Sequence, residues 1–594
     1  MDVRGRQREQ ARRRQFEHAV CDTGPQRCDG GWLIGSGGDD FRGVRPLRQD
    51  AEQGRRLGLR AELGVIRRDD GGGGGALHIL GARVFAEKEA CGEYASDPRI
   101  AAGLSWLAKN YSVKTHPGGN QAYYYYYLYA LERAGVFTGE KYIGGHDWYA
   151  EGAHVLVDAQ NADGSWSSGR DVLPNTCFAL LFLAKGNAPV LVNKLDYGGG
   201  WNVDVYDAAN VTRYISTRFG QRVGWQRVTL DDSLETLLSA PILYVTGHDF
   251  PRMDAAGTAK MRAFFEAGGF MFIDNCCSKK ETDTGVRGFA AAVFPDSPLA
   301  ALDRSHPIYR AFSNVTASEH VFEGVHAGCR DTLIYAAGDI SCAWNRNDME
   351  RDKETFEFGA NLAAYVTGKE RLAPKLAQYK VLPSRRAATA PPGAFAFAQI
   401  VYATGSWNPH PAAGGKLLDY LHAKAGLTVA SQGVTLPLTD RNLANYPFIY
   451  LTGCKRFQLT AEEKSALREY VNRGGFLFSD AACGRAEFDE SFRALMAEVF
   501  GESPLAPIPA DNPVYRIGFD TSRVTYTAAV RELNPNLTAL TLYGITVNGR
   551  IAVVYSPYDI GCALEQLPAY GTRGLVSEDA FKVAANVVLF ALSH

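Results

Sequence analysis

Long apolar runs, closely spaced cysteines and an excess of either charge are all missing from this 594-residue chain. Because no run of 18 apolar residues occurs, the sequence predicts no membrane-spanning helix. None of the 11 cysteines forms a C-x-x-C pair or another zinc-type spacing, so neither a disulfide framework nor a metal site is predicted. The net charge of -2 gives no reason to expect nucleic acid or an anionic membrane as partner.

Lysine is absent from the first 87 residues, although arginine is frequent there and residues 71–75 are all glycine. A disordered basic arm has such a composition, but selection for an arm rarely excludes lysine. We therefore expect residues 1–92 to be disordered or, as the favoured interpretation, mis-translated from a misassigned start. On that interpretation the scattered thiols slightly favour the cytoplasm, but the localisation stays unknown because a signal peptide could have been lost.

Helical periodicity begins near Ser96 and is found over residues 100–109, 121–134, 150–160 and 176–183. The sequence between the last two segments resembles the QW-type repeat of prenyltransferase and squalene-cyclase α/α toroids. The resemblance implies a toroid fragment at 93–190, with a turn on Asp-Gly and a stacked tryptophan. The acidic D-x-D-D motif of those cyclases is absent, which disfavours terpenoid cyclisation. The structural braces implied by this motif are Gln160, Asp163, Gly164 and Trp166.

The segment from Trp201 to Arg310 is repeated without a gap 206 positions later. A constant offset over about a hundred residues indicates two copies of one domain. Further along, the offset rises to 220. Matching stretches include residues 241–247 with 447–453, 268–272 with 474–478, 297–299 with 503–505, and 339–343 with 559–563.

Each copy reads as strand, loop, helix, glycine pair and strand. An apolar run without polar alternation, as at residues 242–245 and 448–451, suits a strand buried on both faces. This order predicts parallel sheets with right-handed crossovers. The predicted fold is multidomain: an N-terminal α/α helical toroid fragment and then two doubly wound, flavodoxin-like α/β domains with mainly parallel sheets.

The motifs Y-x-T-G, GGF-x-F-x-D, SPL and HP-x-Y resemble an uncharacterised bacterial family, domain of unknown function forty-one fifty-nine. That family is similar to the class I glutamine amidotransferase-like superfamily, and the resemblance covers roughly residues 190–594. It implies amidotransferase-like domains at 191–372 and 395–594, joined by a linker at 373–394.

Glutamine hydrolysis requires a cysteine nucleophile on a tight elbow, with histidine and glutamate behind it. Cys454 follows a predicted strand, but His248 occupies that position in the first copy. Cys483 aligns with Cys277, yet neither is in an elbow motif, and His306 has no histidine counterpart. We therefore expect structural cysteines, and the catalytic residues stay unknown.

Several polar and aromatic residues recur in both copies, many of them where predicted strands end. Open α/β sheets bind ligands there, so these residues are candidates for a pocket in which Asp274 or Asp480 meets a ligand hydroxyl. Turn and cap chemistry is the alternative explanation. The candidate pairs are Trp201 and Trp407, Asn202 and Asn408, Thr246 and Thr452, Gly247 and Gly453, Asp274 and Asp480, and Asp339 and Asp559.

The missing nucleophile motif favours a non-catalytic binding or scaffold protein without a cofactor, which recognises a small polar ligand or a protein partner. The alternative is a hydrolase or isomerase that acts on a small polar or sugar-like ligand through the strand-end aspartates. A terpenoid cyclase-like toroid is the third, disfavoured hypothesis. Convergence of the aspartates on one concave pocket would favour an enzyme, whereas their use as backbone caps would count against it.

Overall fold

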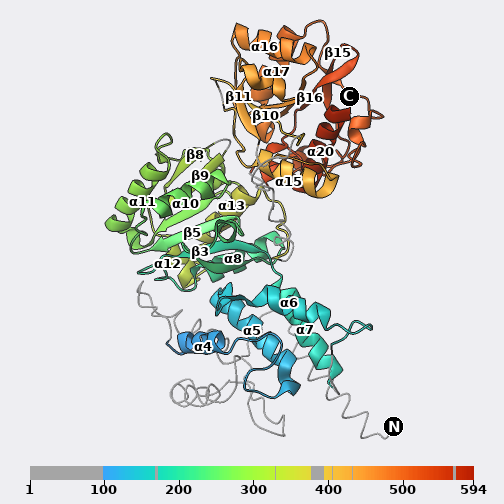
Figure 1. Cartoon of the computed structure of the whole chain (residues 1–594). Helices are drawn as coiled ribbons and strands as arrows, with labels where there is room; N and C mark the ends of the chain where they lie inside the picture. The colour runs from blue at the N-terminus through green and yellow to red at the C-terminus, as the bar shows by residue number, and fades with distance from the viewer. Residues whose placement is uncertain are drawn as a thin grey trace, which may run out of the picture.

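The computed structural model describes residues 98–166, 171–327, 330–375, 393–404, 406–430, 433–565 and 570–593. These residues form a helical unit followed by two α/β domains (Figure 1). The predictions for residues 1–92 and for linker residues 376–392 lie outside the described part of the chain. No helix in that part is both long and apolar enough to cross a membrane.

The helical unit has one apolar core, which includes Trp148, Tyr149 and Trp166. Trp166 donates its indole N–H to the carbonyl of Leu156 at 2.6 Å, and Gln160 donates to the carbonyl of Gly164 at 3.0 Å. The predicted helices are present, but whether they belong to a toroid stays a prediction. They are α4 (Pro98–Lys109), α5 (Tyr124–Thr138), α6 (Trp148–Asp158) and α7 (Val172–Gly186).

The first α/β domain is built on a seven-stranded sheet in the order β4-β3-β5-β6-β9-β8-β7. The first five strands are parallel, and β8 and β7 add an antiparallel edge. The strands are β3 (Val190–Asp196), β4 (Gly224–Thr229), β5 (Ile242–Gly247), β6 (Met271–Asn275), β7 (Ala300–Ala301), β8 (Phe322–Ala327) and β9 (Arg330–Ala336).

Helices cover both faces of this sheet, because successive strand residues point to opposite sides and both sides are apolar. One face carries α8 (Asp207–Phe219), α12 (Ser341–Arg346) and α13 (Lys353–Thr367). The other carries α9 (Leu234–Leu237), α10 (Ala255–Glu266) and α11 (Lys280–Val293).

The second α/β domain repeats this topology, with the strand order β11-β10-β12-β13-β16-β15-β14. The predicted pair of doubly wound, mainly parallel α/β domains is therefore confirmed. The strands are β10 (Ala398–Val401), β11 (Val434–Pro437), β12 (Phe448–Gly453), β13 (Phe476–Ala481), β14 (Ala506–Pro507), β15 (Tyr543–Val547) and β16 (Arg550–Ser556). The helices are α15 (Ala413–Ala425), α19 (Gly561–Glu565) and α20 (Ser577–Ser593) on one face, with α16 (Ala461–Asn472) and α17 (Ala486–Val499) on the other.

Candidate metal centres

Loops that follow three parallel strands of the second α/β domain converge at the carboxyl edge of its sheet. His410 follows β10, Cys483 lies in the short turn after β13, and Asp559 and Cys562 follow β16. All four residues are buried, and their donor atoms lie within 4.8 Å of one another. We call this group the second-domain cluster.

Three donor distances within the second-domain cluster come within about 0.5 Å of those in a tetrahedral zinc shell. Cys562 Sγ lies 3.3 Å from Cys483 Sγ and 3.2 Å from His410 Nε2. His410 Nε2 lies 3.4 Å from Asp559 Oδ2. Zinc bonds of about 2.0–2.3 Å place neighbouring tetrahedral ligands about 3.3–3.8 Å apart. The four donors are thus already close to the separations that one zinc ion requires.

Glu565 supports His410 from the side opposite the cluster. Its Oε2 lies 3.5 Å from Nδ1 of His410, and its Oε1 accepts the backbone N–H of Ala412 at 2.8 Å. Burial lowers the pKa of His410, but hydrogen bonds to Asp559, Cys483 and Glu565 outweigh it and raise that pKa well above its usual value. Gly561 leaves room for the ring, because a Cβ there would lie 2.5 Å from His410 Cδ2.

The first α/β domain has a corresponding group, which we call the first-domain cluster. Cys276 and Cys277 follow β6, and Asp339 and Cys342 follow β9, with their donor atoms within 4.8 Å of one another. The sulfur of Cys276 lies 3.9 Å from that of Cys277 and 3.8 Å from that of Cys342, and the third sulfur pair is 4.0 Å apart. Cys276 is buried, whereas the other three residues are less buried.

The strand-end aspartates all accept backbone N–H groups, and two of them also belong to the clusters. Asp274 accepts the backbone N–H of Ile340 at 2.8 Å, and Asp480 accepts those of Ile560 at 2.7 Å and Gly561 at 3.1 Å. Both carboxylates are fully buried. Burial raises the pKa of Asp274 well above its usual value, and the nearby Asp339 adds to the effect. Asp339 and Asp559 also accept backbone N–H groups, from Cys342 at 3.1 Å and from Cys562 at 2.8 Å, and in addition they belong to the two clusters.

The structure does not gather the other candidate pairs into one pocket. Trp201 lies with its ring 5.7 Å from Lys194 Nζ, which donates to Asn202 at 2.8 Å. In the second domain, the carbonyl of Trp407 and the side chain of Asn408 accept from Gln399 at 3.0 and 3.1 Å. These contacts brace the loops after β3 and β10.

The remaining strand-end candidates have close protein neighbours. Thr246 donates to the carboxylate of Asp274, and Thr452 donates to the backbone carbonyl of Asp480, both at 3.0 Å. A Cβ at Gly247 or Gly453 would approach the hydroxyl of a neighbouring tyrosine to 2.1 or 2.2 Å. Each glycine therefore allows the tyrosine hydroxyl to lie close to the backbone at the end of its strand.

Neither of the lone candidates from the sequence is a member of a four-donor group, although Cys454 packs against one. His306 accepts the backbone N–H of Ile308 at 3.1 Å and contacts Asp331 at 2.7 Å. Asn512, its counterpart, caps the same turn by accepting from Val514 at 3.0 Å. Cys454 packs against Cys483 and Cys562 in an apolar group of the second domain.

Sequence reasoning missed the clusters, although their signal was present. The pairs Cys277/Cys483 and Cys342/Cys562 recur at the two constant offsets, as Asp339/Asp559 does. No C-x-x-C spacing marks them, because their ligands come from loops after different strands. His410 has Asp204 as its counterpart, so pairing alone would not have found it.

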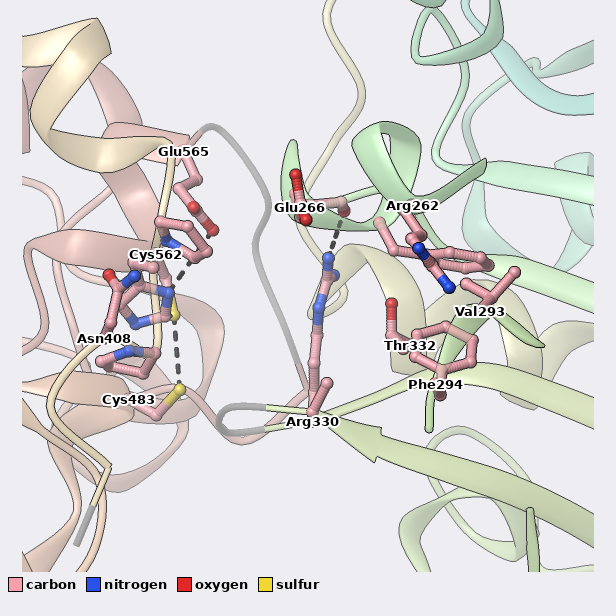
Figure 2. Close-up of a pocket in the computed structure, with 16 residues that line it drawn as sticks. Arg262, Glu266, Val293, Phe294, Arg330, Thr332, Asn408, Cys483, Cys562 and Glu565 are labelled. Atoms are coloured by element: carbon pink, nitrogen blue, oxygen red, sulfur yellow. Dashed lines mark hydrogen bonds and ion pairs between the residues drawn. The ribbon is translucent and has the colours of Figure 1, made fainter. Parts of the chain in front are cut away.

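A cavity of about 300 Å³ lies between the two α/β domains, and the second-domain cluster forms part of its wall. Figure 2 shows Cys483, Cys562 and Glu565 on one side and Arg330, Thr332 and Phe294 on the other. Nη1 of Arg330 is buried without a hydrogen-bond partner among the described residues.

The two Rossmann-like sheets with their equivalent clusters define a tandem α/β protein. The chain belongs to the family described as Domain of unknown function (DUF4159), whose model matches residues 191–367 and 396–592. The predicted family and its tandem arrangement are thereby confirmed. No curated protein matches the chain.

Proposed function

We propose that the chain is a non-catalytic binding protein whose second α/β domain holds a zinc ion through the second-domain cluster. The observation that carries this proposal is the convergence of four buried donors, with Glu565 behind His410. Thiolates, imidazole and carboxylate are the ligands that zinc takes in proteins. Metal-ligating histidines usually direct their second nitrogen to a carboxylate or carbonyl, which matches the position of Glu565.

The electrostatics of the second-domain cluster also favour a cation. Asp559 and Glu565 are both buried, at 0 and 4 % exposure, and His410 is the adjacent cationic group. Buried carboxylates are costly unless positive charge is close to them. A divalent ion supplies this charge and binds the two cysteines as thiolates, with release of their protons.

A closed shell of four protein donors supports binding rather than catalysis. Catalytic zinc sites keep a position for water or substrate, whereas structural sites fill all four positions with protein ligands. The ligand itself would enter the adjacent cavity between the domains. The buried donor of Arg330 in its wall favours a small polar ligand with an acceptor oxygen. The amidotransferase-like resemblance supports the same place, because such α/β domains bind ligands at strand carboxyl ends.

A thiol hydrolase is the second candidate. Cys483 adopts φ 55° in the short turn after β13, which is a strained turn of the kind that presents a nucleophile. The neighbouring Cys562 Sγ, 3.3 Å from Cys483 Sγ, lies 3.2 Å from His410 Nε2, and His410 Nδ1 lies 3.5 Å from Glu565 Oε2. These groups could relay a proton away from a thiol. Two observations disfavour it: Asp559 shares Nε2 of His410, and the first domain has Asp204 in place of this histidine.

Metal analysis of the full chain, purified with reductant and without chelator, tests the proposal. We expect Cys562→Ser to lose one equivalent of zinc by plasma mass spectrometry while its circular dichroism is unchanged. Cys177→Ser, in α7 of the helical unit, is the matched control and retains the wild-type content. Unchanged zinc in Cys562→Ser would overturn the proposal.

Alkylation separates the two candidates. Bound zinc protects Cys483 and Cys562 from iodoacetamide until a chelator is added, so peptide mass spectrometry should find both modified only after chelation. A hydrolase with an activated thiol predicts rapid modification of one of them without chelator. That result would favour the second candidate.

A further inference from the structure

We infer that the first α/β domain holds a second zinc-type ion, bound by Cys276, Cys277, Cys342 and Asp339. This site goes beyond the proposed function, and it rests on that proposal only through the equivalent position in the fold. The inference is carried by sulfur geometry, by compensating residue changes between the copies and by a repeated backbone conformation.

The three sulfurs of the first-domain cluster form a nearly equilateral triangle. Its edges are 3.8, 3.9 and 4.0 Å. Three thiolates that bind one zinc ion with bonds of about 2.3 Å are about 3.8 Å apart in a tetrahedron. Asp339 provides the fourth donor within 4.8 Å of the others.

Residue changes between the two copies keep the number of metal donors at four but change which residues provide them. Asp204 replaces His410, which removes the imidazole, and Cys276 replaces Ala482, which adds a thiol. Cys276 Sγ donates to Asp204 Oδ2 at 3.2 Å, so the added thiol lies against the residue that replaces the lost ligand. Four donors therefore remain in each cluster.

A third change follows from the same replacement. Gly561 makes room for the His410 ring, but its counterpart Ser341 has a side chain, which donates to Asp204 at 2.7 Å. The smaller carboxylate leaves the space that the serine fills. The first-domain cluster is thus a rebuilt site and not a decayed copy.

The backbone at the ligand turn is the same in both domains. Cys277 has φ 56° and Cys483 has φ 55°, values that residues other than glycine rarely adopt. The turn at Cys277 allows two successive side chains, Cys276 and Cys277, to face one centre. Retention of this conformation at a ligand position in both copies is expected where a site fixes the geometry.

The environment of the first-domain cluster suits an exchangeable ion. Three thiolates and Asp339 around a divalent ion leave net negative charge, and Arg346 lies within electrostatic reach of Cys342 and Asp339. Cys277, Asp339 and Cys342 are less buried than Cys276, whereas all four second-domain donors are buried. Sulfur-rich sites prefer soft metals, so cadmium should displace zinc here more readily than from the second-domain cluster.

Zinc counting on the full chain tests this inference separately from the proposed function. We expect two equivalents in the wild type and in Cys177→Ser, one in Cys342→Ser, one in Cys562→Ser and none in the double variant. Cys277→Ser, which changes a more exposed residue, is the second variant if Cys342→Ser fails to fold. One equivalent in the wild type that Cys562→Ser alone removes would overturn the inference and leave the proposed function intact. One equivalent in the wild type that Cys342→Ser alone removes would overturn the proposed function and leave this inference intact.

Cobalt substitution gives an independent readout, because sulfur-to-cobalt charge transfer increases with the number of bound thiolates. The cobalt ion that remains in Cys562→Ser should show the stronger near-ultraviolet absorption, from three thiolates against two in Cys342→Ser. A disulfide among Cys276, Cys277 and Cys342 in protein purified with reductant, detected by mass spectrometry, would also overturn the inference.

Discussion

Glu565 Oε2 lies 3.5 Å from Nδ1 of His410, on the far side of the imidazole from Cys483, Asp559 and Cys562. This relationship fixes which ring nitrogen faces the cluster. It also keeps the ring in place, because Glu565 is itself anchored by the N–H of Ala412. The carboxylate therefore acts on the proposed metal through His410 rather than by direct contact.

Replacement of this carboxylate should weaken zinc binding without removing a ligand. We expect Glu565→Gln to lower the affinity of the second-domain cluster by about 10-fold to 100-fold, measured by competition with a chromophoric chelator. Glu498→Gln, which removes an exposed partner of Lys464, is the control and should leave affinity unchanged. Equal affinity of Glu565→Gln and wild type would show that His410 needs no such support.

Asp480 should prove to be a structural residue. Its carboxylate holds the N–H groups of Ile560 and Gly561 and accepts from Tyr450 at 2.5 Å. Asp480→Ala leaves three buried donors without this acceptor, the two N–H groups and the Tyr450 hydroxyl, and should destabilise the domain by about 3 kcal/mol. Asp480→Asn should be much milder, because its amide can face the tyrosine while its oxygen accepts both N–H groups. Urea unfolding distinguishes them, and equal stability of wild type and Asp480→Ala would contradict this role.

The fold could be predicted from the sequence because its signals are local and occur twice. The apolar runs at β5 and β12, the glycine pairs and the helices between them report burial on both faces of a sheet. The antiparallel edge formed by β7 and β8 was not predicted. Strand β7 consists of only two residues, and both are exposed. Its pairing depends on contacts between distant parts of the chain.

The candidate site was harder to predict, because its ligands are brought together only by the sheet. His410 and Cys562 are 152 positions apart, and no local spacing relates them. Asp480 lies near the end of β13 and Asp559 follows β16, and both hold backbone N–H groups, yet only Asp559 also lies among the thiols. Which role each takes depends on the loops after β16, whose course the sequence pattern does not specify.

The cavity between the α/β domains provides a test of ligand binding. Arg330 contributes a buried Nη1 without a partner among the described residues, while its Nη2 donates to the carbonyl of Gly268. A carboxylate or phosphate oxygen would satisfy this donor. We expect phosphate or malonate to raise the Tm of the wild type and to have a smaller effect on Arg330→Met. Arg456→Met, which changes an exposed arginine, is the control. Equal shifts in all three proteins would exclude the cavity as the binding site.

Lys375 should make stability depend on pH. Its Nζ lies 5.2 Å from the ring centre of Trp148, and burial lowers its pKa from 10.5 to about 8. Between these pH values the unfolded chain binds more protons than the folded one, so stability should rise with pH across that window. Below about pH 8 the buried charge opposes folding.

Lys375→Met removes this charge. The variant should be more stable at pH 7, by at most about 3 kcal/mol, and should lose the added stability between pH 8 and pH 10.5. Urea unfolding followed by tryptophan fluorescence measures both effects, and Lys353→Met, on an exposed side chain, is the control. The same pH dependence in wild type and Lys375→Met would show that another group causes it.

The ligand sets of the two clusters should be interconvertible, because three residue changes account for the differences at and beside their ligands. The triple variant Asp204→His, Cys276→Ala and Ser341→Gly gives the first domain the ligand set of the second. We expect it to retain two equivalents of zinc per chain, while the charge-transfer absorption of its cobalt-substituted first-domain site falls by about a third as three thiolates become two. The variant with only Cys276→Ala and Ser341→Gly has no replacement ligand and should bind the first ion far more weakly. If the triple variant loses the first-domain ion as readily as the variant with only Cys276→Ala and Ser341→Gly, the imidazole does not substitute for the thiol. The two sites are then not equivalent.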